Sequence, residues 1–230
     1  MSAGTRLRAA AKADGVRFLD SYASLLALLT ANFFLLELVD DRRWGAIGST
    51  LLFAAALVVA ISDPQTGDTI TRRQAISILI ALGLSSVLLF STADELVGLA
   101  YLLPAALLVT ATLPVTLDRV LHHKTVTFET ILGAVCIFVL VGLLFAFVFL
   151  AVDDLRDAPF FAQEGLHEQS EYVYFSFVAL TTLGFGDLSP TVGLPQALTV
   201  VEAIVGQIFL VTLVARLVTL WVYTARSDGS

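Results

Sequence analysis

The sequence predicts an all-α membrane protein with six transmembrane helices and one additional short re-entrant helix. Of its 230 residues, 57% are apolar and 14% are charged, whereas a soluble domain has about half apolar and a quarter charged residues. The mean hydropathy is +0.88. Six predominantly apolar runs approach the length of about 20 residues that a transmembrane helix needs, and a seventh apolar stretch is too short to span. This pattern excludes a soluble enzyme.

The six runs are each bounded by charged or turn residues. The first is followed by Asp40, Asp41 and two arginines instead of a small-residue cleavage site, so we expect it to be a retained helix and not a signal peptide. The third run is the shortest, and we expect it to extend at both ends. In chain order, the predicted helices cover residues 22–39, 44–62, 75–90, 96–117, 128–152 and 195–223.

The distribution of basic residues predicts the orientation, because basic loops stay on the cytoplasmic side. With the N-terminus inside, ten of the 13 Lys and Arg residues are cytoplasmic, and Arg42, Arg43 and Arg156 are outside. Six spans then place both termini in the cytoplasm of a multi-pass plasma-membrane protein. The ten cytoplasmic residues are Arg6, Arg8, Lys12, Arg17, Arg72, Arg73, Arg119, Lys124, Arg216 and Arg226.

The net charge and the cysteine count exclude two other kinds of site. A formal net charge of -7, with basic residues scattered singly or in pairs, argues against a nucleic-acid partner, because phosphate binding needs a concentrated basic surface. The single cysteine, Cys136, lies in an apolar run, so a disulfide within the chain is impossible and a cysteine-based metal site is not expected.

A strongly apolar stretch of twelve residues, 172–183, lies between the last two predicted spans. Twelve helical residues cannot cross a bilayer, so we expect a short helix that enters the membrane and returns. We place this helix at 170–181. Ser170 is a candidate N-cap, and Glu171 in the first turn faces the positive end of the helix dipole.

The sequence Thr-Thr-Leu-Gly-Phe-Gly-Asp follows at residues 181–187 and resembles the selectivity-filter signature of potassium channels. Leu183 and Phe185 stand where that signature usually has Val and Tyr. The resemblance covers about 128–223 and implies a pore domain, 128–230, in the family's order. Its parts are an outer helix 128–152, a pore helix 170–181, a filter segment 182–187 and an inner helix 195–223. It also implies that Gly206, 19 residues after Asp187, is the inner-helix hinge.

The rest of the chain resembles six-helix channels in helix number alone. We expect a cytoplasmic N-terminal segment 1–19, a four-helix membrane domain 20–117 and a basic interfacial linker 118–127. The fourth helix, 96–117, occupies the place of a voltage sensor but contains no Lys or Arg, so the field across the membrane has no charge there to move. We therefore expect no conventional voltage gating.

The filter segment has the residue types that passive potassium conduction requires. A potassium ion sheds its water in a narrow pore, and rings of backbone carbonyls replace its hydration shell. Successive carbonyls point the same way when ordinary and left-handed residues alternate, and glycine adopts the left-handed form without penalty. We assign potassium coordination to the carbonyls of Thr182, Leu183, Gly184 and Phe185, with Gly186 completing the filter and the Thr182 hydroxyl forming the innermost site.

Several side chains are expected to support this segment. We expect Leu183 and Phe185 to pack against the short helix and Asp187 to lie at the external mouth. The resemblance also shows two departures that predict a less firmly braced filter. Phe185 lacks the tyrosine hydroxyl of many channels, and Val178 stands where some members have a glutamate.

Glu202 is a candidate for replacing this missing support, together with Thr181 and Val178. It lies seven residues inside the last predicted span and one turn before Gly206, so both residues share a helix face. If Gly206 packs against the short helix, Glu202 faces Ser176 or Thr181 and, as a protonated carboxyl group, donates a hydrogen bond. Two alternatives stay open: a charged group that attracts cations near the pore, and an interhelical contact without a role in conduction.

The sequence therefore predicts a potassium-selective channel and not an enzyme. One filter per chain supplies a quarter of a ring, so we expect a homotetramer. The expected partners are membrane lipids, potassium ions and a separate regulatory subunit, with no cofactor besides the permeant ion. Seven residues follow the last predicted helix, so we expect no attached cytoplasmic sensor domain. The alternatives are a weakly selective cation channel, a potassium-transporter subunit and a non-conducting scaffold.

Overall fold

The computed structural model describes residues 24–36, 38–39, 42–61 and 128–227, and five single positions between residues 76 and 113. The predicted helices 75–90 and 96–117 lie outside the described residues apart from those single positions. So do the N-terminal segment 1–19 and the whole of the linker 118–127.

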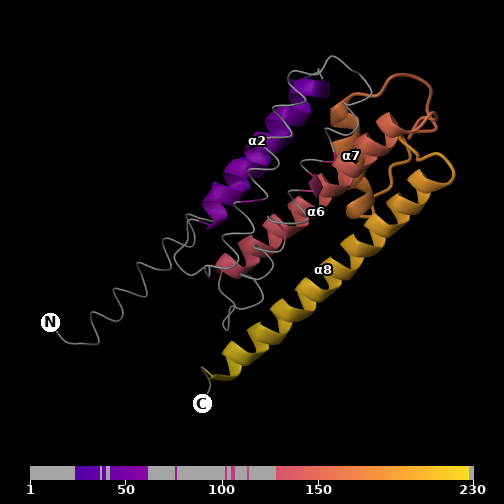
Figure 1. Ribbon diagram of the computed structural model, residues 1–230. Coiled ribbons are helices and arrows are strands. Elements are labelled where there is room, and N and C mark those ends of the chain that lie inside the picture. Colours follow the sequence, from indigo (N-terminus) through magenta and orange to yellow (C-terminus); the bar gives the residue numbers. More distant parts are fainter. Residues whose placement is uncertain are drawn as a thin grey trace.

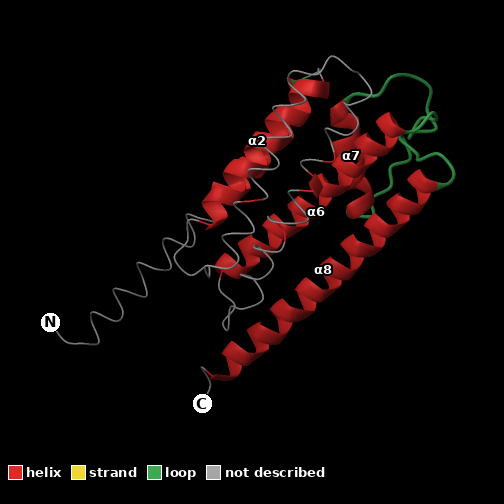
Figure 2. Cartoon of the chain, in the orientation of Figure 1, coloured by secondary structure: helices red, strands yellow, loops and turns green. Residues whose placement is uncertain are grey.

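All secondary-structure elements longer than a single bridge in the described residues are helices, which confirms the predicted all-α class (Figures 1 and 2). The helix Ser24–Leu36 precedes the labelled elements. The labelled helices are α2 (Arg42–Ile61), α6 (Phe128–Leu155), α7 (Gln169–Leu180) and α8 (Leu194–Ser227). Within the same residues, the strand-like pairing is limited to an isolated antiparallel bridge between Phe161 and Pro190.

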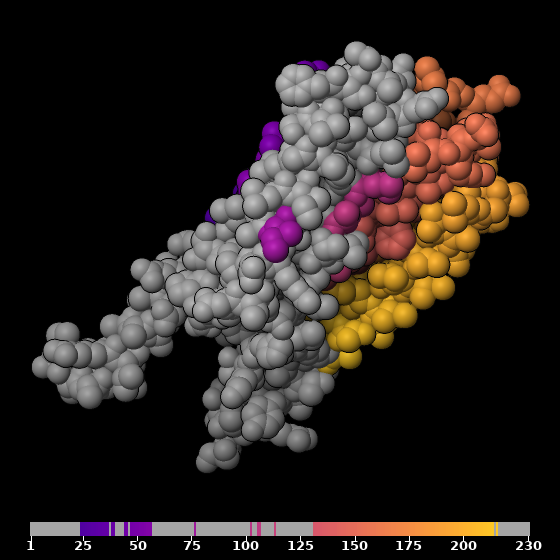
Figure 3. Space-filling model, in the orientation of Figure 1, coloured from indigo at the N-terminus to yellow at the C-terminus, as the bar shows by residue number. Residues whose placement is uncertain are grey.

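Two of the described helices are long and apolar enough to cross a membrane. They contain the segments Ile131–Leu155 of α6 and Leu194–Leu213 of α8, which overlap the predicted spans 128–152 and 195–223. In the most apolar window of α6, 56% of the residues are buried within the chain, against 11% for α8. Figure 3 shows the described part of α8 along one edge of the molecule. Large apolar side chains of α8 are exposed within the single chain, among them Ile204, Ile208 and Val211.

The short helix α7 lies at one end of the α6–α8 pair (Figure 1). It begins at Gln169 with Glu168 as its N-cap, so the predicted N-cap, Ser170, is wrong. The reason is a capping box: Glu171 Oε2 accepts a hydrogen bond of 2.9 Å from the Glu168 backbone N–H, which satisfies a donor at the helix start. Glu171 does lie in the first turn, as predicted.

An aromatic cluster fixes the α6–α7 loop to these helices. The loop residues Phe160 and Phe161 are fully buried, with their rings against those of α6 and α7. Ring centroids are 4.6 Å apart for Phe149 and Phe160 and 4.8 Å apart for Phe161 and Tyr172. Burying rings of this size stabilises the loop through the area removed from water and through contacts between the rings.

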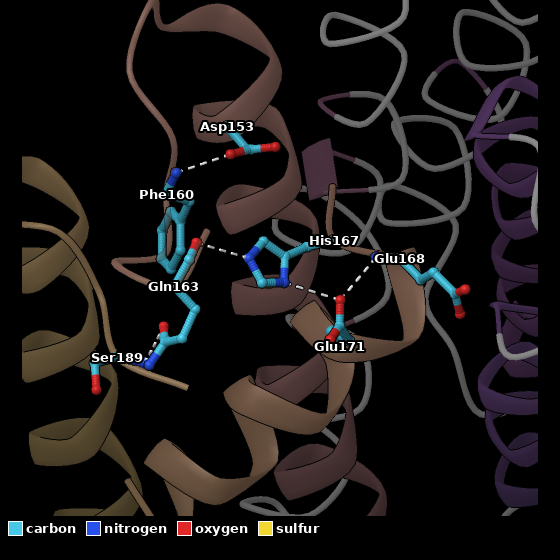
Figure 4. A network of polar contacts seen from close by, with 7 residues as sticks. All are labelled: Asp153, Phe160, Gln163, His167, Glu168, Glu171 and Ser189. Atoms are coloured by element: carbon cyan, nitrogen blue, oxygen red, sulfur yellow. Dashed lines mark hydrogen bonds and ion pairs between the residues drawn. The ribbon is translucent and has the colours of Figure 1, made fainter. Parts of the chain in front are cut away.

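A polar network joins the same loop to the segment after the filter (Figure 4). Asp153 Oδ1 accepts a hydrogen bond of 2.8 Å from the Phe160 backbone, and Gln163 Oε1 accepts one of 3.0 Å from the Ser189 backbone. The ring of His167 lies between Glu171 Oε2, at 3.0 Å, and the Gln163 carbonyl, at 3.3 Å. The network therefore connects the loop with the start of α7 and with the segment that leads to α8.

The described N-terminal helices pack against the α6–α7 pair. The rings of Phe53 in α2 and Phe147 in α6 are 5.7 Å apart, and Phe33 lies 6.4 Å from Phe177 in α7. Gln169, at the start of α7, is buried and donates a hydrogen bond of 3.1 Å to the Val39 carbonyl. The first residue of α7 is thus held by the N-terminal part of the chain.

Candidate functional site

The site begins where α7 ends, because the first amides of the filter segment close the helix. The Thr182 N–H donates a hydrogen bond of 2.9 Å to the Ala179 carbonyl, and the Leu183 N–H donates one of 3.0 Å to the Val178 carbonyl. This is the pair of bonds of a Schellman motif, in which the residue after the C-cap is left-handed. Thr182 occupies that position with φ of 58°. Helix termination and the start of the filter segment therefore share one residue.

Left-handed residues recur at every second position through the filter segment. Positive φ values of 58°, 56° and 82° occur at Thr182, Gly184 and Gly186. In the described part of the chain, Thr182 is the one residue other than glycine with positive φ. A β-branched residue in this conformation is a true outlier, with a cost of roughly 1–2 kcal/mol. The sign of φ thus alternates from residue to residue through this segment.

The side chains of the filter segment are exposed within the single chain. Leu183 is 61% exposed and Phe185 is 66% exposed, so α7 does not cover them within the single chain, and their expected packing against the short helix stays a prediction for the assembled protein. A methyl group built on Gly184 or Gly186 likewise meets no atom within 4 Å. Two large apolar side chains on a segment with a specific backbone conformation indicate a surface that another molecule covers.

Asp187 at the end of the filter segment is tied to α7. The Tyr174 hydroxyl donates a hydrogen bond of 2.7 Å to Asp187 Oδ2. This bond lowers the pKa of Asp187, because it stabilises the carboxylate, and raises the pKa of Tyr174. Both residues face a groove of about 680 Å³ that opens to solvent. Tyr174 was not among the residues predicted from the sequence, although its hydroxyl is the group that holds Asp187.

Glu202 of α8 is completely buried and contacts Ser176 of α7, one of its two expected neighbours. Glu202 Oε1 lies 2.5 Å from Ser176 Oγ, and Ser176 Oγ lies 2.7 Å from the Gly142 carbonyl of α6. Side chains or backbone of all three helices therefore meet at one buried hydroxyl.

Gly206 allows α8 to lie against the end of α7. A methyl group built on Gly206 would lie 2.1 Å from the Leu180 carbonyl oxygen and 3.0 Å from the Leu180 carbonyl carbon. Both are backbone atoms, which cannot move aside as a flexible side chain does. The structure thus gives Gly206 a packing role, and α8 continues as a helix through this position. The hinge role stays a prediction.

The two other expected supporting residues lie at the end of α7. Thr181 is the C-cap, and its hydroxyl donates a hydrogen bond of 2.6 Å to the Phe177 carbonyl. Val178 is buried, and its backbone carbonyl is the acceptor for Leu183. The structure therefore brings Thr181, Val178 and the filter segment together through the backbone, with Glu202 one helix turn away at Ser176.

A comparison with protein families finds a match in the same part of the chain. Residues 135–222, from α6 through α7 and the filter segment to α8, match a family model described as "Ion channel". No curated protein and no solved structure matches the chain.

Two long apolar helices, a short helix between them and the family match together indicate a membrane protein with an ion-channel-type region at residues 135–222. The match is to a family of ion channels and not to a family of enzymes.

Proposed function

We propose that this chain is the subunit of a homotetrameric channel that conducts potassium passively and selectively. The observation that carries the proposal is the alternation of left-handed φ at Thr182, Gly184 and Gly186 within the sequence Thr-Thr-Leu-Gly-Phe-Gly-Asp. Alternating handedness turns successive carbonyls toward one side, where they replace the hydration shell of the ion. In this proposal, the carbonyls of residues 182–185 coordinate potassium, and the Thr182 hydroxyl forms the innermost site.

Fourfold assembly follows from the need for a closed ring. One chain has one such segment, so four copies around one axis complete each layer of oxygens. The exposed side chains of Leu183 and Phe185 support this assembly, because neighbouring subunits would cover them. The exposed apolar face of α8 then lies toward other subunits and lipid.

The remaining features of the proposal come from the sequence. Six spans with both termini in the cytoplasm satisfy the distribution of basic residues, in which ten of 13 fall on one side. This topology places the α6–α7 loop and Asp187 at the external face of the plasma membrane. A carboxylate there, next to the filter segment, raises the local concentration of cations.

A glycine-to-alanine pair tests the proposal. We expect Gly184→Ala to abolish or degrade selective potassium flux from liposomes, because a Cβ penalises the left-handed conformation at φ of 56°. Gly165→Ala is the matched control: Gly165 in the α6–α7 loop has φ of 131°, and a methyl group there meets no atom within 4 Å. It introduces backbone strain outside the filter segment.

The expected result is parent-like flux in Gly165→Ala and lost or sodium-permeable flux in Gly184→Ala. Unchanged selectivity in Gly184→Ala would contradict the assigned filter. Equal sodium and potassium flux through the parent would instead favour a weakly selective cation channel.

A further inference from the structure

The geometry around Ser176 indicates which of the two residues, Glu202 or Ser176, donates the hydrogen in their buried contact. Ser176 Oγ has close oxygen neighbours on two sides, Gly142 O at 2.7 Å and Glu202 Oε1 at 2.5 Å. A serine hydroxyl has one hydrogen to donate, and a backbone carbonyl can only accept. If Ser176 donates to Gly142, the second contact has a hydrogen only when the carboxyl group of Glu202 supplies it.

The opposite assignment leaves two oxygen atoms in contact without a hydrogen. If an ionised Glu202 accepted from Ser176, the Ser176 and Gly142 oxygens would face each other at 2.7 Å with no hydrogen between them. Within the described residues, Glu202 Oε2 is buried and has no hydrogen-bond partner. A neutral carbonyl oxygen tolerates this burial far better than half of an ionised carboxylate does.

The register of α7 and α8 shows what this contact positions. Glu202 and Gly206 are four residues apart on α8, and their contacts Ser176 and Leu180 are four residues apart on α7. Residues at this spacing lie on one face of a helix, so one face of α8 holds one face of α7 at two successive turns. The second of these turns contains Val178 and Ala179, whose carbonyls accept hydrogen bonds from the first amides of the filter segment.

We propose that Glu202 is a positioning residue of the filter and acts as a neutral carboxylic acid that donates its hydrogen to Ser176. The polar chain Glu202–Ser176–Gly142 then fixes α7 between α8 and α6. Through the Val178 and Ala179 carbonyls, α7 in turn fixes the amides of Leu183 and Thr182. The inference rests on the proposed potassium conduction for its functional readout, while the protonation of Glu202 is measurable without conduction.

Matched substitutions at Glu202 test the positioning role. Glu202→Gln keeps a donor of similar reach, so we expect parent-like selectivity and stable current. Glu202→Ala removes the donor, and Glu202→Asp shortens the reach by one methylene. In both we expect about a tenfold loss of potassium-over-sodium selectivity or of the lifetime of the conducting state, the fold-change of one lost buried hydrogen bond. Asp157→Ala removes an exposed carboxylate from the α6–α7 loop and is expected to match the parent.

Ser176 provides the second half of the test. We expect Ser176→Ala to reproduce the loss in Glu202→Ala, and the double variant to be no worse than either single variant, because both changes remove the same link. Additive losses would overturn the link between these residues. Equal losses in Glu202→Gln and Glu202→Ala would show instead that Glu202 acts as a cation attractor.

Infrared spectroscopy of the purified, folded channel tests protonation independently of conduction. The difference between the parent and Glu202→Gln at neutral pH should contain the carbonyl stretch of a protonated carboxylic acid. Carboxylate bands in that difference would overturn the neutral form. If the parent fails to select potassium, the proposed function is wrong, and the infrared result still shows whether Glu202 is protonated. If the parent selects potassium and Glu202→Ala behaves identically, the positioning role is wrong.

Discussion

The hydroxyl of Tyr174 donates a hydrogen bond of 2.7 Å to Asp187 Oδ2 and so connects α7 with the residue that ends the filter segment. Phe185, two residues earlier, has no hydroxyl with which to make such a connection. The structure therefore places one polar link at Asp187, the last residue of the filter segment, and a second polar link at Ser176, about half a helix turn further along α7 than Tyr174. Both links lie on α7, which suits a helix that positions the filter.

Removal of the Tyr174 hydroxyl is expected to change the response to external acid. The hydrogen bond lowers the pKa of Asp187, so the carboxylate of the parent stays ionised to a lower pH than an ordinary aspartate. In Tyr174→Phe the pKa returns upward, and the negative charge is lost at a higher pH as the solution is acidified. The stabilisation from this bond is likewise present at neutral pH and lost as the pH falls through the pKa of Asp187.

Single-channel conductance measured against external pH checks this expectation. The acid-induced fall in conductance should begin at a higher pH in Tyr174→Phe than in the parent. Asp187→Asn is the control, because it removes the titrating group and should make the two backgrounds alike. Superimposable pH profiles for the parent and Tyr174→Phe would show that this link does not affect the charge of Asp187.

Gly206→Ala is expected to destabilise the contact between α7 and α8. The added methyl group would lie 2.1 Å from the Leu180 carbonyl oxygen, so one of the two helices must move. Overpacking of this kind costs about 1–3 kcal/mol, more than the roughly 1 kcal/mol that alanine gains over glycine in a helix. Thermal unfolding of the purified channel measures the effect.

Gly48→Ala on α2 is the matched control for this substitution. Its methyl group would meet the end of the Leu35 side chain, at 2.7 Å, which can rotate away. We expect little change or a small gain in its unfolding temperature. A Gly206→Ala variant as stable as Gly48→Ala would show that α8 does not approach the α7 backbone so closely.

Two substitutions at Thr182 separate its backbone role from its hydroxyl. Thr182→Gly removes the strain of φ at 58° but also the hydroxyl of the proposed innermost ion site. Thr182→Ser keeps the hydroxyl. We expect potassium to raise the thermal stability of the parent and of Thr182→Ser more than sodium does, because ligand binding stabilises the folded state.

The potassium-specific increase should be smaller in Thr182→Gly, even where its stability in sodium equals that of the parent. Unfolding curves at matched ionic strength in potassium and in sodium provide the measurement. A full potassium-specific increase in Thr182→Gly would exclude the hydroxyl from ion binding.

The absence of basic residues from 96–117 predicts weak voltage dependence. One elementary charge moving across 100 mV yields about 2.3 kcal/mol, and a helix without charge yields none. Open probability recorded between strongly negative and strongly positive potentials should therefore change little. A gating charge of several elementary charges per channel would identify a sensor elsewhere in the chain.

Much of the described fold was predictable because its signals are local. Long apolar runs predicted α2, α6 and α8 to within a few residues, and the two glycines of the filter segment were expected at positions where φ is positive. The start of α7 was misplaced because two capping signals overlap there. Ser170 is a common N-cap residue, yet the pair Glu168 and Glu171 forms the capping box that determines the boundary.

Contacts between distant residues were harder to predict. The Tyr174–Asp187 bond depends on how the chain returns past α7, which the local sequence does not specify. The burial of Phe160 and Phe161 in a loop rich in acidic residues depends on rings contributed by α6 and α7. Glu202 was the exception, because its spacing from Gly206 and one assumed helix contact were enough to indicate Ser176 or Thr181 as its neighbour, and it contacts Ser176.

The central claim, selective potassium conduction through residues 182–186, is tested most directly by the reversal potential of the purified parent channel in a planar bilayer. A tenfold potassium gradient, balanced by an opposite sodium gradient, should give a reversal potential near the potassium equilibrium value of about 60 mV. This value follows because a tenfold concentration ratio corresponds to about 1.4 kcal/mol, and 100 mV corresponds to about 2.3 kcal/mol per charge. A reversal potential near zero, with equal permeation of both ions, would contradict the account.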